Sequence, residues 1–190
     1  RDVKFNQDGT KMFVLGKTND RVCEYTLSTG FDLTSTVTFV DCFSIASQET
    51  RPNELEFSPD GTKMFIMGEI GVDINEYTLS TGFDLRSTVT FVDSYSVNSQ
   101  ETFPMGLAFS YDGTKMFVTG WTGDDINEYT LSTGFDLTST VTFVDSFSVR
   151  SEEEKPSSLV FSSDGSKMFV VGNNGIDVNE YTLSCYYGVI

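Results

Sequence analysis

The sequence predicts an all-β fold: a β-propeller built from four 52-residue, four-stranded antiparallel blades, the last of which is incomplete. Three features recur every 52 residues: an Asp-Gly turn, the triplet Lys-Met-Phe directly after it, and the segment Glu-Tyr-Thr-Leu-Ser further on. A fixed period of this length is typical of a propeller, a solenoid or an array. The four turns begin at Asp8, Asp60, Asp112 and Asp164.

The third copy of the repeat shows why each unit reads as four strands. Residues 107–109 form a short alternating strand, and the turn that follows contains Gly113, which is placed to adopt a positive φ. Residues 115–119, 126–132 and 140–149 are further β-rich segments separated by short polar loops, and nothing has helical periodicity. Such a meander predicts a propeller blade. The alternative, a β-solenoid, usually has shorter coils, which Asp-Gly hairpins would interrupt.

The repeat boundaries predict one propeller domain, or a segment of a larger propeller, across residues 1–190. The blades then span approximately residues 1–51, 52–103, 104–155 and 156–190.

The fourth blade departs from the pattern after Ser184, where residues 185–190 (CYYGVI) replace Thr-Gly-Phe-Asp-Leu-Thr and the fourth strand is absent. The third strand of this blade then becomes an exposed edge, which is a template for pairing with another chain. Three explanations stay open: a piece of a longer ring, copies that assemble into a ring or fibre, or a four-bladed ring with a short last blade. We expect a partner chain to cover this edge, with assembly contacts at Tyr181, Cys185, Tyr186 and Tyr187.

The repeat also resembles a known type of sequence. Residues 57–65 (FSPDGTKMF), followed by 76–81 (EYTLST), resemble the S-P-D-G-T-K-M repeats of marine bacteriophage structural proteins and related bacterial surface proteins. They are also similar to the YVTN-type propeller repeat. The resemblance covers nearly the whole chain, and it implies an extracellular or virion-borne propeller that binds or adheres.

Composition excludes several classes of function. The chain carries a net charge of -16, with 28 acidic and 12 basic residues, so nucleic acid and anionic membranes are poor partners. No apolar run approaches the roughly 18 residues of a membrane helix, and we expect no membrane insertion. The absence of histidine removes the usual general base and every Ser-His or Cys-His pair.

Two of the three cysteines are predicted to form a disulfide. Cys23 replaces the Asn of the other copies, and Cys42 replaces their Ser, in the third and fourth strands of one blade. Opposite residues of an antiparallel hairpin have a constant index sum, and the midpoint of this pair falls inside the connecting loop. A bridge implies an oxidising compartment. The alternative is two buried free thiols, and Cys185 is left over.

The loops between the second and third strands vary most among the copies, and variation on a repeated scaffold is where function tends to sit. By analogy with propellers, these loops lie on the face that usually carries binding. The only tryptophan, Trp121, could stack on a sugar ring beside carboxylates, or it could simply cover the blade edge. The predicted ligand-binding residues are Glu69, Asp73, Trp121, Thr122, Asp124, Asp125, Asn173, Asn174 and Asp177.

A weaker signal concerns calcium. Glu49, Glu101 and Glu153 occupy one repeat position, and clustered hard oxygens suit Ca²⁺. A solvated acidic rim is the alternative, and no other cofactor is expected.

We expect a non-catalytic binding or adhesion module, not an enzyme, on an extracellular or virion surface. Its partners would be a glycan or cell-surface receptor, together with other copies of itself or a flanking part of a longer chain. A structural protein that assembles into a ring or fibre is the alternative. The third class is a carboxylate-based glycoside hydrolase or lyase, which needs two carboxylates at a suitable separation.

Overall fold

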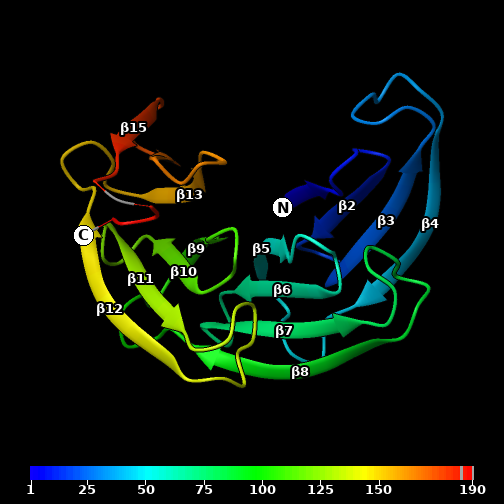
Figure 1. The fold of residues 1–190 in the computed structure, drawn as a ribbon, viewed down its shortest axis with the longest axis horizontal. Coiled ribbons are helices and arrows are strands. Elements are labelled where there is room, and N and C mark those ends of the chain that lie inside the picture. The colour runs from blue at the N-terminus through cyan, green and yellow to red at the C-terminus, as the bar shows by residue number, and fades with distance from the viewer. Residues whose placement is uncertain (185, 190) are drawn as a thin grey trace. The chain divides into compact units, whose positions relative to one another are not determined.

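A computed structural model of the chain describes residues 1–184 and 186–189. Every regular element in these residues is a β-strand, and the strands form four antiparallel sheets (Figure 1), three with four strands and one with three. The all-β propeller prediction, with a short last blade, is therefore confirmed. Among the described residues no helix is long and apolar enough to cross a membrane.

The chain divides into two compact units, Arg1–Ser94 and Tyr95–Ile190. Unit 1 contains two sheets, in the strand orders β1-β2-β3-β4 and β5-β6-β7-β8. Its strands are β1 (Asp2–Phe5), β2 (Lys11–Gly16), β3 (Arg21–Leu27), β4 (Val37–Ser44), β5 (Pro52–Phe57), β6 (Lys63–Gly68), β7 (Asp73–Leu79) and β8 (Val89–Ser96), whose last residues reach into unit 2.

Unit 2 contains the other two sheets, in the orders β9-β10-β11-β12 and β13-β14-β15. Its strands are β9 (Pro104–Phe109), β10 (Lys115–Gly120), β11 (Asp125–Leu131), β12 (Val141–Ser148), β13 (Pro156–Phe161), β14 (Lys167–Gly172) and β15 (Val178–Thr182). In both units each strand pairs with its neighbours in sequence, so every sheet is a meander. We number these four sheets as blades 1 to 4.

The Asp-Gly turns close the first hairpin of each blade. In blade 2, the Asp60 carboxylate accepts hydrogen bonds from the Thr62 backbone N–H (3.0 Å) and hydroxyl (2.8 Å). Gly61 has φ +70°, and a Cβ there would lie 2.1 Å from Cδ2 of Phe83. Glycine is therefore required twice at this position, for its backbone conformation and for the aromatic ring that covers it.

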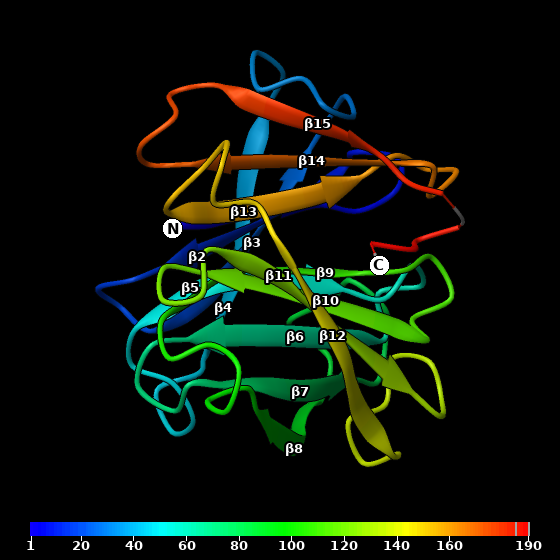
Figure 2. The ribbon, with the colours of Figure 1, turned by 90° about the vertical axis from the view of Figure 1, so that its left-hand side faces the viewer.

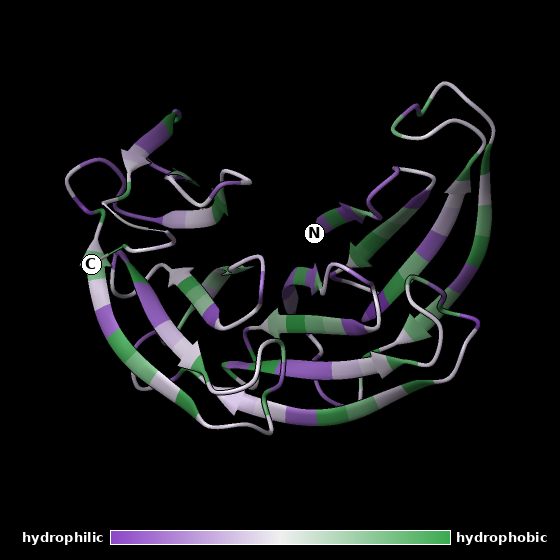
Figure 3. Ribbon diagram, viewed as in Figure 1, coloured by the Kyte–Doolittle hydropathy of each residue, from purple (hydrophilic) through white to green (hydrophobic). Residues whose placement is uncertain are grey.

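The core of each unit lies between its two sheets. Hydrophobic and hydrophilic residues alternate along the strands (Figure 3), so one face of a strand can pack while the other carries polar groups. In unit 1 the ring of Phe13 lies 4.7 Å from that of Phe57. In unit 2 Phe117 and Phe161 repeat this contact at 4.6 Å. The repeated Phe residues are therefore the contacts that join successive blades.

The predicted disulfide is confirmed. Cys23 and Cys42 are directly opposite in the β3–β4 register, they are bonded, and their Cα atoms are 4.1 Å apart. The other complete blades use a hydrogen bond at this place, from Ser94 to Asn75 (2.8 Å) and from Ser146 to Asn127 (2.7 Å). A covalent bridge in blade 1 thus replaces a polar side-chain pair.

The end of the chain keeps more of the repeat than the sequence suggested. Tyr187 donates its backbone N–H to the Gly165 carbonyl (3.0 Å), as Phe83 does to Gly61 (3.0 Å). Tyr187 and Val189 are both 5% exposed and belong to the core of unit 2. An aromatic residue and an aliphatic residue at these two positions preserve the local packing, although the residue types differ from those of the other blades.

The predicted assembly residues divide accordingly. Tyr187 is buried within unit 2, whereas Tyr186 is 54% exposed, and Cys185 lies outside the described residues. Tyr181 donates its hydroxyl to Glu152 (3.3 Å) and packs edge-on against Phe147. β15 is the outermost strand of its three-stranded sheet (Figure 2). The prediction that a partner covers this edge stays a prediction.

Candidate functional site

Four charged side chains meet on the first strands of blades 1 and 2. Asp2 and Lys4 lie on β1, and Glu54 and Glu56 lie on β5. The Lys4 ammonium is 2.7 Å from a Glu56 oxygen, 3.2 Å from a Glu54 oxygen and 3.7 Å from an Asp2 oxygen. One cation thus contacts three carboxyl groups, all within unit 1.

Strand geometry places these groups together. Residues two apart on a strand point to the same face, so Asp2 and Lys4 form one pair and Glu54 and Glu56 another. The Asp2 carboxylate also accepts the backbone N–H of Leu55 (3.1 Å), which joins β1 to β5. The cluster is therefore held by backbone as well as by side-chain contacts.

Burial and charge set the protonation of the cluster. Burial, together with the neighbouring charges of Asp2 and Glu56, raises the pKa of Glu54 to about 9, although Lys4 opposes the shift. Burial also raises the pKa of Glu56, although Lys4 opposes the shift. For Lys4, burial lowers the pKa, but the neighbouring carboxylates outweigh it and keep it above its usual value. These shifts favour the ammonium form of Lys4 and the protonated form of Glu54 at neutral pH.

These charges break the repeat. The position of Asp2 and Glu54 is occupied in blades 3 and 4 by Gly106 and Ser158. The position of Lys4 and Glu56 is occupied there by Ala108 and Val160. The sequence analysis did not select these residues. Aligning the first strand of each repeat would have found them, because charge at a position that is otherwise small or apolar is a local exception to the scaffold.

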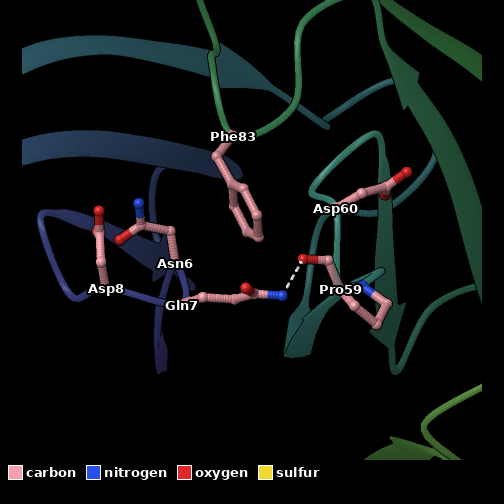
Figure 4. A pocket seen from close by; sticks show the side chains of 6 residues that line it. All are labelled: Asn6, Gln7, Asp8, Pro59, Asp60 and Phe83. Atoms are coloured by element: carbon pink, nitrogen blue, oxygen red, sulfur yellow. Dashed lines mark hydrogen bonds between the residues drawn. The ribbon is translucent and has the colours of Figure 1, made fainter.

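Two adjoining pockets open next to the cluster, in the same unit. The smaller, about 160 Å³, is lined by Lys4 and Glu56 together with Phe5, Gln7, Phe57, Ser58, Pro59 and Phe83. The larger, about 550 Å³, is lined by Asn6, Gln7, Asp8, Pro59, Asp60 and Phe83. The ring of Phe83 points into this pocket, and Gln7 crosses it to donate a hydrogen bond to the Pro59 carbonyl (2.8 Å) (Figure 4).

This arrangement supplies the groups that hydrolysis of an ester-like bond needs. Glu54 is only 7% exposed and carries a proton that it can donate. The Glu56 side chain is 22% exposed and lines the smaller pocket, where it can accept a proton. Lys4 lies between them and can stabilise a developing oxyanion.

The loop around Trp121 is shaped mainly by internal contacts. The indole stacks on Phe103 at 4.9 Å, and Lys155 Nζ lies 5.7 Å from the ring centre. Its Nε1 is buried and has no hydrogen-bond partner among the described residues. The half-buried indole therefore packs within unit 2, and its role in ligand binding stays a prediction.

The neighbours of Trp121 are also engaged within unit 2. The Thr122 backbone N–H donates to Glu101 (3.2 Å), and the Asp124 carbonyl accepts from Val149 (3.0 Å). The Asp125 carboxylate accepts a hydrogen bond from Asn127 (2.9 Å), and burial raises its pKa. These residues fix the shape of the loop.

Glu69 and Asp73 lie at the corresponding loop of unit 1. Glu69 accepts a hydrogen bond from Lys17 (2.8 Å) and pairs with Arg1 and Arg51. Burial raises the pKa of Glu69, but Lys17 and the two arginines outweigh it and hold that pKa below its usual range. Asp73 accepts a hydrogen bond from Asn75 (2.8 Å), and burial raises its pKa.

In blade 4 the loop residues follow the same design. The Asn173 backbone N–H donates to the Lys155 carbonyl (3.1 Å), and the Asn174 N–H donates to Glu153 (3.1 Å). Asp177 accepts a hydrogen bond from Asn179 (3.2 Å). These polar groups make contacts within the blade. A ligand role for the loops stays a prediction.

The three glutamates predicted for calcium have another role in the structure. Each is at most 1% exposed, and its carboxylate accepts the backbone N–H of the residue just before the next strand and N–H groups of the variable loop. For Glu153 these donors are Lys155 (2.9 Å), Asn174 (3.1 Å) and Gly175 (2.8 Å). The described residues contain no group of three or more acidic or Cys side chains that could hold a metal ion. We interpret Glu49, Glu101 and Glu153 as clamps that shape the loops, and calcium binding at these residues stays a prediction.

Comparison with known proteins identifies the fold. No protein-family model and no curated protein sequence matches the chain. Among solved structures, it is similar to a protein from Lactobacillus plantarum, with a TM-score of 0.70 and 18% identity over 98% of this chain and 52% of that one.

Two further solved structures carry names of enzymes. A candidate 6-phosphogluconolactonase from Bacteroides uniformis matches with a TM-score of 0.66 and 14% identity, over 96% of this chain and 50% of that one. The periplasmic gluconolactonase of Pseudomonas aeruginosa matches with a TM-score of 0.61 and 17% identity, over 96% of this chain and 49% of that one. The chain thus spans about half the length of the structures it matches.

These names correct the expected function. We expected a non-catalytic adhesion module and no enzyme, with a structural protein as the alternative. The similarity to structures named as lactonases contradicts that expectation. That expectation was drawn from the variable loops and left out the charged first strands of unit 1.

The compartment expectation holds in its general form. The Cys23–Cys42 disulfide and the periplasmic location in the name of one similar structure both favour a secreted or periplasmic protein.

Proposed function

We propose that the chain forms the catalytic part of a propeller hydrolase that opens sugar lactones, with Lys4, Glu54 and Glu56 as its reacting groups. The observation that carries this proposal is the partly buried charge cluster, in which Lys4 and Glu56 line the smaller pocket and Lys4 also contacts Glu54, whose pKa is raised. The names of the similar structures support the choice of a lactone as substrate.

The proposed reaction assigns one step to each group. Glu56 takes a proton from water as the water oxygen bonds to the lactone carbonyl carbon, and Lys4 stabilises the resulting oxyanion. The ring C–O bond then breaks, and Glu54 donates its proton to the departing alkoxide oxygen. The proton held by Glu56 restores Glu54, and the hydroxy acid product loses its own proton in water.

The pocket favours a neutral substrate. Asp8 and Asp60 line the larger pocket, and Lys4, the one cation among the described lining residues, already contacts three carboxyl groups. The whole chain carries a net charge of -16. A phosphorylated lactone would be repelled, whereas an uncharged sugar ring could pack on the exposed face of Phe83. We therefore expect an unphosphorylated lactone to be the better substrate.

The test is a pH-stat assay of glucono-lactone hydrolysis, corrected for the spontaneous rate. We expect Glu54→Gln and Glu56→Gln to lower kcat/KM by about 100-fold or more, the usual contribution of one proton-transfer group. Ser158→Ala, which changes the repeat position of Glu54 in blade 4, is the matched control and should retain full activity. A wild-type rate no greater than that of buffer would refute the proposed function.

The 6-phosphorylated lactone tests the substrate separately. We expect its kcat/KM to be at least about 10-fold lower than that of the neutral lactone, because charge repulsion acts on binding and approach. A preference for the phosphorylated compound would contradict the neutral substrate while leaving hydrolysis in place.

The narrower resemblance to S-P-D-G-T-K-M repeat proteins supports a proposal about location: that the chain works outside the cytosol, on a cell or virion surface. The disulfide supports the same proposal. Cell fractionation followed by thiol labelling tests it, and a chain recovered from the cytosol with both Cys23 and Cys42 reduced would contradict it.

A further inference from the structure

The joint between blades 1 and 2 has two complementary parts. The first, which we call the socket, is the ion pair of Lys11 on β2 with Glu24 on β3 (2.9 Å). The second, which we call the docking loop, is the segment from Phe83 to Leu85 of blade 2. Lys11 donates to the Phe83 carbonyl (2.5 Å), and Glu24 accepts the Leu85 backbone N–H (2.8 Å). The socket therefore binds backbone groups of the loop on both sides.

Unit 2 repeats this joint with different side chains. The socket is Lys115 with Glu128 (2.9 Å), and Lys115 donates to the Tyr187 carbonyl (2.9 Å). Tyr187 and Val189 take the places of Phe83 and Leu85 and are almost completely buried. The joint thus depends on backbone polar groups together with one aromatic and one aliphatic side chain, and it tolerates changes among these.

Blade 4 carries a socket that lies open. Lys167 and Glu180 form the same ion pair, but their side chains are 45% and 49% exposed, whereas the Glu24 and Glu128 side chains are 1% and 5% exposed. Beside this pair, Val178 is 64% exposed, although Val22, Ile74 and Ile126 at the same repeat position are fully buried. An apolar and charged surface that other blades cover is therefore exposed on blade 4.

Blade 1 carries a docking loop that is likewise exposed. Phe31 and Leu33 are 63% and 62% exposed, whereas the leucine or valine at the position of Leu33 is at most 6% exposed in the other three blades. The loop already has the shape used in the other joints, because Phe31 has φ 58° and donates its N–H to the Gly9 carbonyl (3.0 Å). The loop would lose little conformational entropy on binding, because it already has the bound conformation.

We propose that the socket of blade 4 binds the docking loop of blade 1 from a second copy of this chain. Lys167 donates to the Phe31 carbonyl of the second copy, and Glu180 accepts its Leu33 N–H, as Lys11 and Glu24 do within unit 1. Val178 and the Phe169 ring then pack against the second copy's apolar residues. The joint is head-to-tail, since the two surfaces that meet are different.

A second copy is the occupant that the observations favour. The chain itself presents both halves of the joint, so identical copies are complementary without any new surface. In addition, two propellers that the chain resembles are about twice as long as the chain, which is the length of two copies. The association is separate from the hydrolytic activity, because its residues lie outside the charge cluster.

The experiment uses two variants that each disable one half of the joint. Phe31→Ser/Leu33→Ser changes the docking loop, and Val178→Asp/Glu180→Lys changes the socket. Both alter exposed side chains, so the fold should survive, which circular dichroism checks. Tyr111→Ser, at a residue that is 66% exposed in blade 3, is the matched control for loss of a surface aromatic.

Sedimentation equilibrium then measures the association. We expect the wild type and Tyr111→Ser to associate, and each double variant to raise the dissociation constant at least about 100-fold, because two apolar contacts are lost or a charge is buried. A mixture of the two variants should form a one-to-one dimer, since one copy still has an intact socket and the other an intact docking loop.

Two outcomes would overturn the proposal. A wild-type chain that stays monomeric at about 100 µM would show that no second copy binds the socket. A mixture of the two variants that stays monomeric, while the wild type associates, would show that the copies meet through some other surface.

Discussion

The first strands of the two units occupy the same repeat positions and carry opposite kinds of residue. In unit 1 these positions hold Asp2, Lys4, Glu54 and Glu56, which form one buried charge cluster. In unit 2 they hold Gly106, Ala108, Ser158 and Val160, and a Cβ on Gly106 would lie 2.9 Å from the Ser158 Cα. One pair of blades thus carries a charge cluster on these strands, and the other uses them for close packing.

The difference shows where to search for function in a repeated sequence. Residues that recur in every copy, such as the Asp-Gly turns and the Lys-Glu sockets, build the blade or join it to the next. Loops that vary can still be structural, as the clamps at Glu49, Glu101 and Glu153 show. A charged residue that replaces a small or apolar one inside a strand is a local exception to the repeat, and we therefore examine it for function.

The largest expected effect comes from removing the cation of the cluster. Lys4→Met leaves three carboxyl groups facing one another, and we expect it to lower the free energy of unfolding by about 3–5 kcal/mol, the usual result of breaking a buried ion pair. Urea denaturation measures the change. Lys4→Arg keeps the charge and should lose less. A loss below about 1 kcal/mol for Lys4→Met would mean that the cluster is solvated like a surface pair.

The next effect compares the covalent cross-strand bond of blade 1 with the hydrogen bonds of the other complete blades. Cys23→Asn/Cys42→Ser installs the pair that blades 2 and 3 use. We expect a loss of about 2–3 kcal/mol, because the bridge restricts the unfolded chain more than a hydrogen bond stabilises the folded one. Thermal unfolding of both proteins under oxidising conditions measures it. Equal thermal stability of the two proteins would show that the Asn–Ser pair stabilises blade 1 as much as the disulfide does.

A smaller loss is expected from crowding the first strands of unit 2. Gly106→Ala should cost about 1–3 kcal/mol, since the new methyl group meets backbone at 2.9 Å. Gly16→Ala is the control, because the nearest atoms there are 3.8 Å away. Equal losses of stability from the two substitutions would show that the first strands of unit 2 are not packed more closely than the surroundings of Gly16.

The last comparison concerns the pH dependence of stability, which is a change of slope and not a single loss. The folded-state pKa of Glu54 is raised to about 9, so folding favours its protonated form, and stability falls as pH rises from the unfolded-state value toward 9. Glu54→Gln, which makes this position uncharged as in unit 2, should flatten that decline by up to about 1.4 kcal/mol per pH unit, the slope that one proton contributes. Urea midpoints at pH 5, 7 and 9 test it. Parallel profiles would mean that Glu54 is ionised in the folded protein.

Much of the fold could be predicted from the sequence. The 52-residue period, the Asp-Gly turns and the alternation within strands predicted the four blades, and the index sum of Cys23 and Cys42 predicted their pairing. These features are local or periodic, so they are visible in the order of residues. The candidate site was missed, because Lys4 and Glu54 are fifty residues apart and meet only when β1 lies beside β5.

The sequence by itself determined the blade, its turns and the disulfide, because hairpin pairing and side-chain alternation follow from neighbours along the chain. Only the tertiary structure decided the protonation of Glu54 and the burial of Tyr187, together with the exposure of Phe31 and Glu180. Each of these depends on what lies across a joint between blades, where burial changes the cost of charge and water can no longer reach the backbone. Residues at equivalent positions of the repeat therefore differ in burial and protonation according to their neighbours in space.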